Sequence, residues 1–160
     1  MQDRFKFRTV LKTDKHVILV EPFYILEDSY FIDINKAETE FECKYPEECF
    51  WDFIDEIKKQ DYIQEISSDS DLILTKDFTN LIQCTGLKDK NGTLIYEGDI
   101  VKIFHVSGTM QGRYFTDVVE WNNARSRFDT ENYGIFNDDD IYEVIGNIYE
   151  NPELLEVKND

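Results

Sequence analysis

Two segments that alternate apolar and polar residues, and that are interrupted by glycine, constrain the fold of this chain most strongly. The first runs from Gln83 to Val101 and contains Asn91-Gly92 and Gly98-Asp99. The second runs from Glu143 to Leu154 and contains Gly146. Alternation over a few residues is typical of half-buried strands, and Asn-Gly or Gly-Asp pairs mark tight turns. The sequence therefore predicts short, closely connected strands in its C-terminal half.

The spacing of the apolar residues changes near Pro46. Phe50, Phe53, Ile54 and Ile57 follow the i, i+3, i+4, i+7 pattern and predict one amphipathic helix from about Pro46 to Gln60. Elsewhere the pattern favours strands, so we expect an α+β protein that is predominantly β. The predicted strands are Phe5–Leu11, His16–Val20, Phe23–Leu26, Tyr30–Ile34, Leu72–Leu74, Leu81–Thr85, Ile100–Val106, Tyr114–Trp121, Ser126–Asp129 and Ile141–Ile148.

A chain of 160 residues suits one domain or two subdomains that share a core. The polar run Ser67–Asp71 indicates a boundary. We therefore expect an N-terminal, β-rich subdomain over 1–78 that holds the helix. A C-terminal subdomain over 79–160 is expected to form a small bent sheet or SH3-like barrel, because its predicted strands are short and evenly spaced.

The glycine and asparagine positions of the two alternating segments are predicted to be structural. Asn91 is expected to hold the first positive-φ position of a type I′ turn. Pro152 is expected to end the last strand, leaving Leu154 and Leu155 to pack against it. The full set of predicted structural turn residues is Gly86, Asn91, Gly92, Gly98, Asp99, Gly146 and Pro152.

These same segments carry a resemblance to a known family. Phe5-Lys6-Phe7-Arg8, Thr85–Gly92, Ile95–Val101 and Val144–Pro152 resemble the N-terminal, central and C-terminal signatures of the YopX family, small proteins encoded by phages and prophages of Gram-positive bacteria. The resemblance implies a phage-related protein that works inside a bacterial cell. It brings no catalytic residues and no cofactor, because the family has no established activity.

The negative net charge makes some classes of binding partner unfavourable. The chain carries −17 at pH 7, and both halves contribute about equally. This charge repels phosphate backbones and anionic membranes, so neither nucleic acid nor membrane is an expected partner. The N-terminal residues contain no apolar segment typical of a signal peptide, and three cysteines without framework spacing indicate a reducing compartment. The expected location is the bacterial cytoplasm.

Residues that could support catalysis or metal binding show no specific pattern. Asp138–Asp140 and Asp89–Gly92 lack the spacing of a calcium loop. A catalytic pair of Cys84 and His105 is an open alternative, but Cys84 in a predicted strand is more typical of a buried apolar position. We therefore expect no metal, no cofactor and no enzymatic activity.

The candidate interaction surface is Trp121 with Arg125 and Arg127, which we expect to lie close together because the two arginines would share one face of a strand. Such a group could bind an anion, although a solvated surface is the simpler interpretation. The favoured function is a phage accessory module that binds a protein. The alternatives are an acidic DNA mimic that inhibits a host nucleic-acid-binding protein, and an enzyme of unknown chemistry. Self-association is a further open alternative.

Overall fold

The computed structural model describes residues 6–21, 24–25, 30–60, 63–67, 72–75, 81–132, 134–136 and 139–155. The chain divides into two compact units. The N-terminal unit comprises Phe7–Ile82, and the C-terminal unit comprises the chain from Gln83 onward together with Lys6. The run Ser67–Asp71, predicted as a boundary, lies outside the described residues except for Ser67. The strands on either side of it pair with each other, and the two units divide between Ile82 and Gln83.

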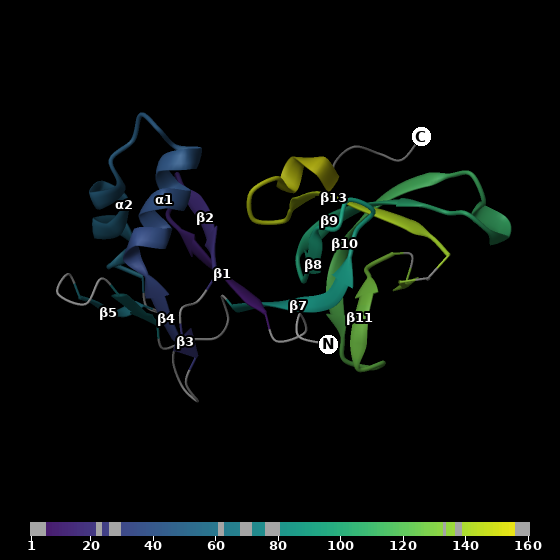
Figure 1. Ribbon diagram of the computed structural model, residues 1–160, viewed down its shortest axis with the longest axis horizontal. Helices are drawn as coiled ribbons and strands as arrows, with labels where there is room; N and C mark the ends of the chain where they lie inside the picture. The colour runs from purple at the N-terminus through teal and green to yellow at the C-terminus, as the bar shows by residue number, and fades with distance from the viewer. Residues whose placement is uncertain are drawn as a thin grey trace. The chain divides into compact units, whose positions relative to one another are not determined.

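The N-terminal unit contains two groups of antiparallel strands (Figure 1). β1 (Phe7–Lys12) pairs with β2 (Val17–Val20), with Leu11 opposite Ile18. The other strands form a four-stranded sheet in the order β3-β4-β6-β5. Their bounds are β3 (Tyr24–Ile25), β4 (Tyr30–Asp33), β5 (Ile63–Ser67) and β6 (Leu72–Thr75).

This unit also contains two helices where the sequence predicted one. α1 (Ile34–Lys44) was missed because few of its residues are apolar, and only Ile34, Ala37 and Phe41 are buried. Asp33 caps it, since its side chain accepts hydrogen bonds from the backbone N–H groups of Asn35 and Lys36. The predicted helix is α2, but it spans only Phe50–Ile57, because residues 46–48 form a turn before it.

The helices and β2 enclose an aromatic core. The rings of Phe41, Phe50 and Phe53 pack within 6.2 Å of one another. Phe41 is fully buried, as are Ile54 and Ile57 of α2. This burial confirms that the apolar stripe of α2 faces a core.

The C-terminal unit is built around a five-stranded antiparallel sheet in the order β12-β11-β10-β9-β13. A hairpin of β7 (Leu81–Lys88) and β8 (Leu94–Tyr96) precedes it. The remaining bounds are β9 (Asp99–Phe104), β10 (Tyr114–Asn122), β11 (Arg127–Thr130), β12 (Gly134–Ile135) and β13 (Ile141–Asn147), with short 3-10 helices η3 (Gly108–Met110) and η4 (Pro152–Leu155).

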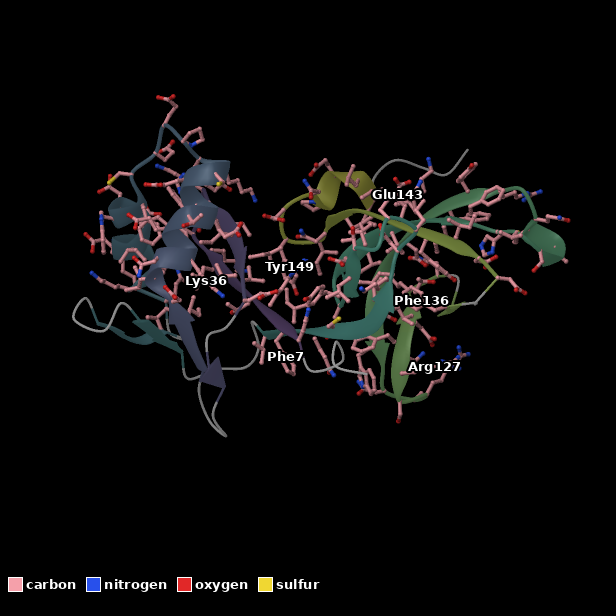
Figure 2. The ribbon with its side chains drawn as sticks, in the orientation of Figure 1. Phe7, Lys36, Arg127, Phe136, Glu143 and Tyr149 are labelled. Atoms are coloured by element: carbon pink, nitrogen blue, oxygen red, sulfur yellow. The ribbon has the colours of Figure 1, made fainter. Side chains whose placement is uncertain are left out.

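One face of this sheet forms the second core. Ile95, Val101, Ile103 and Val119 are buried there, and Phe136 packs beside them with its ring 4.8 Å from that of Tyr142 (Figure 2). One of the four-stranded sheets of the protein curls into a half-barrel. The predicted fold class, α+β with mostly β structure and a bent C-terminal sheet, is confirmed.

The loop between β7 and β8 covers the edge of β13. The backbone N–H of Lys90 donates to the carbonyl of Tyr142 at 2.9 Å, and the Asp89 carboxylate accepts from the N–H of Val144 at 3.1 Å. The Lys90 ammonium lies 2.8 Å from Glu143 Oε2. The loop thus supplies partners to part of an edge that would otherwise bond to water.

The turn in this loop differs from the prediction for Asn91. Of the described residues other than glycine, Ser126 alone has a positive φ. The Gly92 N–H donates to the Asp89 carbonyl at 3.0 Å, so Lys90 and Asn91 occupy the centre of a type I turn. Only Gly92, which follows that turn, needs the left-handed conformation, with a φ of +85°.

The other predicted turn residues have separate structural roles. Gly86 and Gly98 also have positive φ, and Gly98 lies against the ring of Tyr149. At Gly146 a Cβ would lie 2.7 Å from Asn151 Oδ1. Pro152 does not end β13, because that strand stops at Asn147 and Pro152 begins η4.

Candidate interaction surface

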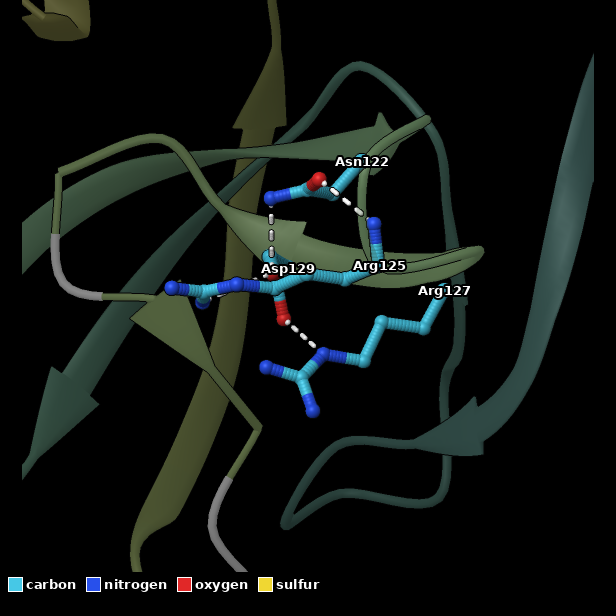
Figure 3. A network of polar contacts seen from close by, with 4 residues as sticks. All are labelled: Asn122, Arg125, Arg127 and Asp129. Carbon is cyan, nitrogen blue, oxygen red and sulfur yellow. Dashed lines mark hydrogen bonds and ion pairs between the residues drawn. The ribbon is translucent and has the colours of Figure 1, made fainter.

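The end of the β10–β11 hairpin holds the arginines that the sequence singled out (Figure 3). We call residues 122–127 the hairpin end. Asn122 and Arg127 are the last paired residues of the two strands. The N–H of Arg125 donates to the Asn122 carbonyl at 3.2 Å and to Asn122 Oδ1 at 3.1 Å, which closes the turn. Ser126 completes it with a φ of +50°.

A buried carboxylate organises the side chains of the hairpin end. Asp129 has only 1% of its surface exposed. Its Oδ1 accepts from Arg127 Nε at 2.8 Å, and its Oδ2 accepts from Asn122 Nδ2 at 3.0 Å and from Arg125 Nη1 at 3.4 Å. Each arginine therefore has a fixed direction, while its guanidinium group still reaches solvent.

Trp121 is not grouped with these arginines, contrary to the expectation from sequence. It lies opposite Phe128 in the strand pairing, and the two rings make an edge contact at 5.0 Å. Successive residues of a strand point to opposite faces, so Trp121 belongs to the face that carries Val119 and the core, whereas Asn122 and Arg127 point to the other face. Trp121 lies at the rim of that core with 41% of its surface exposed.

Exposed apolar side chains gather in the C-terminal unit. Of ten large hydrophobic residues that are more than a third exposed in the described chain, Trp51 is the one outside it. The other nine are Leu87, Val106, Met110, Tyr114, Trp121, Ile141, Ile145, Ile148 and Leu155. Single exposed apolar side chains are normal on a protein surface, so only those that form a contiguous group indicate an interface.

Cys84 and His105, the pair considered for catalysis, have separate environments. Cys84 is completely buried, and its sulfur accepts a hydrogen bond from the Gly86 N–H at 3.4 Å. His105 Nδ1 lies 2.8 Å from Asp140 Oδ2, and its ring makes an edge contact with Phe115. Within the described residues no group of three or more His, Cys, Asp or Glu side chains is placed to hold a metal ion.

Several buried polar side chains of this unit hold backbone groups in place. Asp99 accepts from the N–H of Tyr96 at 2.8 Å, and Asp117 accepts from the N–H and side chain of Asn132. Asn147 Oδ1 accepts from the N–H groups of Tyr149 and Glu150. These contacts stabilise turns and leave the groups little freedom to serve a substrate.

Two titrating groups of the C-terminal unit are perturbed. Burial raises the pKa of Asp89, but hydrogen bonds from the backbone N–H groups of Thr93, Val144 and Asn91 and from the Asn91 side chain outweigh it, so the pKa lies below its usual value. The pKa of Tyr149 is raised, first by burial and second by the charge of Glu97. Both groups serve packing and turn formation.

Neither helix of the described chain has the length and apolar character needed to cross a membrane.

Comparison with known proteins identifies a family. A family model described as YopX protein matches residues 6–156. The crystal structure of protein EF1440 from Enterococcus faecalis is similar, with 23% sequence identity, coverage of 94% of this chain and 96% of that one, and a TM-score of 0.46. No curated protein matches the chain.

Proposed function

Because the chain belongs to the YopX family, whose model matches residues 6–156, we propose that it is a phage-type accessory protein without enzymatic activity that acts by binding another protein. The observation that carries this proposal is the hairpin end, where a buried carboxylate holds two exposed arginines.

The arginines of the hairpin end are suited to a protein interface because they are already ordered. Their side chains remain 55% exposed at Arg125 and 40% exposed at Arg127, although both contact Asp129. Ordering a long side chain on binding costs about 0.5–1.5 kcal/mol, and Asp129 removes part of that cost before a partner arrives. Arginine is also among the residue types most enriched among the side chains that dominate binding energy.

The chemistry of the hairpin end favours a partner that offers carboxylates. Arg127 donates to Asp129 through the Nε of its guanidinium group (Figure 3). A guanidinium group binds a carboxylate of a partner through two parallel hydrogen bonds. Two arginines against one aspartate give the cluster a charge of +1, in a chain that carries −17 overall.

Affinity capture from a bacterial host lysate, followed by measurement of the dissociation constant for the captured protein, tests this function. Arg125→Ala should weaken that binding by about tenfold or more, the loss typical of an interface arginine. Arg113→Ala is the matched control, because Arg113 is an exposed arginine outside the hairpin end. Equal affinities of the two variants would exclude the hairpin end as the interface, and capture of no protein would contradict the proposed function itself.

A second candidate function, mimicry of DNA, has one specific observation in its favour. Between Glu38 and Glu56 the chain has eight acidic residues and one base, Lys44, and all eight acids are at least partly exposed. These are Glu38, Glu40, Glu42, Glu47, Glu48, Asp52, Asp55 and Glu56. Capture of a nucleic-acid-binding protein that duplex DNA competes away would support mimicry, whereas capture that duplex DNA leaves unchanged and that Arg125→Ala weakens supports the hairpin end.

A further inference from the structure

The five-stranded sheet has a second face, which points away from the core. Tyr114, Phe104 and Ile141 are cross-strand partners on β10, β9 and β13, so their side chains share one face. We call these three residues the outer row. The next row on the same face is Thr116, Lys102 and Glu143. The intervening residues, such as Ile103, point to the opposite face and into the core.

The outer row is apolar and exposed. Tyr114 has 58% of its surface exposed and Ile141 has 43%, and the ring of Tyr114 packs on that of Phe104 at 4.8 Å. The Lys102 ammonium lies 4.7 Å from the centre of the Tyr114 ring, so it covers one side of that ring without removing it from solvent. Two aromatic rings and an isoleucine on three adjacent strands form a continuous apolar strip.

A stretch of chain without acidic residues carries Phe104 and Tyr114 of the outer row. Residues 100–116 contain no aspartate or glutamate, and this is the longest such stretch in a chain with 34 acidic residues. It carries Lys102 and Arg113 instead. Two copies of a chain with a charge of −17 repel each other, and they can approach at the lowest electrostatic cost where acidic residues are missing.

The second row carries one positive and one negative side chain, which could pair with the same two side chains of a second copy. Lys102 and Glu143 are direct cross-strand partners, one positive and one negative. A two-fold axis that lies in the contact plane, parallel to β9 and β13 and midway between them, would place the lysine of each copy opposite the partner's Glu143. The Glu143 carboxylate already accepts from Lys90 at 2.8 Å, and its remaining acceptor sites can bind a second cation. Two-fold dimers with one shared patch are the commonest protein assemblies.

We propose that the outer row is a self-association surface that binds a second copy of this chain. In the dimer the two apolar strips pack against each other, and the pair of Lys102 and Glu143 is repeated across the two-fold axis. The outer row lies at the start of β10 and the hairpin end lies after its last residues, so the dimer contact does not use the arginines and does not depend on the proposed function.

Sedimentation velocity over a range of protein concentrations tests the proposal. We expect a monomer–dimer equilibrium that shifts toward the dimer when salt rises from about 50 to about 500 mM, because screening weakens the net repulsion. Ile141→Asp should raise the dimer dissociation constant by about tenfold or more. Leu155→Asp is the matched control, since it adds the same charge at an aliphatic residue with a similar exposure of 41%. A wild-type protein that stays monomeric at all concentrations would overturn the proposal.

Exchanging the charges of Lys102 and Glu143 shows whether association depends on this specific pair or only on the net charge of the protein. Lys102→Glu should weaken the dimer, and the double variant Lys102→Glu/Glu143→Lys should restore it, because the complementary pair is rebuilt in reversed order. If the double variant keeps the melting temperature of the wild type but does not associate, the two-fold arrangement is contradicted. Loss of the dimer in Leu155→Asp would assign the contact to another surface. If Ile141→Asp proves unfolded by circular dichroism, the charge exchange decides the question.

Discussion

The carboxylate of Asp89 accepts a hydrogen bond from the backbone N–H of Val144 at 3.1 Å, across 55 residues of sequence. The same carboxylate binds the N–H groups of Asn91 and Thr93 at 2.8 Å each. One side chain therefore fixes its own turn and attaches that turn to the edge of β13. The two signature segments of the sequence are thereby joined.

Asp89→Asn should destabilise the protein by about 2–3 kcal/mol, since hydrogen bonds to a charged group each contribute about 1.5–3 kcal/mol. Asparagine keeps one acceptor oxygen and presents an N–H₂ group to backbone donors. Urea unfolding at neutral pH measures the change. Asp55→Asn is the control, because Asp55 is an exposed partner of Lys58 and its loss should cost less than about 0.5 kcal/mol. Equal effects of the two variants would contradict the role assigned to Asp89.

The stabilisation from Asp89 should depend on pH with a defined sign. Its pKa is lower in the folded state than the usual 3.8, so the folded state favours the ionised form. The contribution is therefore complete above pH 3.8 and declines as the pH falls through the lower, folded-state pKa. Unfolding free energies of wild type and Asp89→Asn should converge below that range. A difference that is constant from neutral pH to strongly acid pH would contradict this linkage.

Alanine at Gly92 and at Gly98 should have different costs. At Gly92 a Cβ meets nothing within 4 Å, so only the positive φ opposes it, at about 1 kcal/mol. At Gly98 a Cβ would also lie 3.0 Å from Tyr149 Cε2 and 3.4 Å from Ile148 Cγ1, so we expect a larger loss. Thermal unfolding of the two variants gives the order, and a greater loss at Gly92 would show that the loop has contacts of another kind.

Arg127→Gln should destabilise the protein by about 1.5–3 kcal/mol, because it removes a 2.8 Å charged hydrogen bond from a buried carboxylate. Arg113→Gln removes an exposed charge from the same unit and should change stability by less than about 0.5 kcal/mol. A double-mutant cycle with Asp129→Asn measures the coupling. Additive effects of Arg127→Gln and Asp129→Asn would mean that the arginine is not held by Asp129.

Tyr149 should make the folded protein sensitive to alkali. Burial and the charge of Glu97 raise its pKa above 10.0, so its contribution is intact below pH 10.0 and is lost as the pH rises through the folded-state pKa. Tyr149→Phe cannot ionise and should lose less stability than wild type above that pH. Absorbance titration at alkaline pH, compared between wild type and Tyr149→Phe, identifies the late-titrating tyrosine. If the two titrations differ only by a group with an ordinary pKa, the assignment is wrong.

Several strands could be predicted from the sequence because the patterns that indicate them lie within a few consecutive residues. Alternation and glycine positions predict β1, β9, β10 and β13 closely. α1 was missed because its helical pattern rests on Ile34, Ala37 and Phe41 alone. The Asp33 cap followed by that spacing is the signal that could have revealed it.

The candidate surface was only partly predictable for a different reason. The two arginines contact a common partner, Asp129, which was not anticipated, and Arg125 lies in the turn before β11 and not on a strand. The placement of Trp121 on the opposite face depends on the register of β10 and β11. Likewise, the outer row joins three strands whose pairing is set by long-range contacts, and a single sequence does not display that pairing.

The bond between Asp89 and Val144 also bears on the order in which the chain folds. The β7–β8 hairpin can form as soon as its own residues are made, but the Asp89 carboxylate acquires its last partner only after β13 has been synthesised and has paired with β9. Contacts this distant in sequence carry a large loop-closure cost and form late. Attachment of the β7–β8 loop to β13 is therefore expected to be one of the last steps of folding. In a nascent chain that stops before residue 144, the Asp89 carboxylate has formed its turn but lacks its partner on β13.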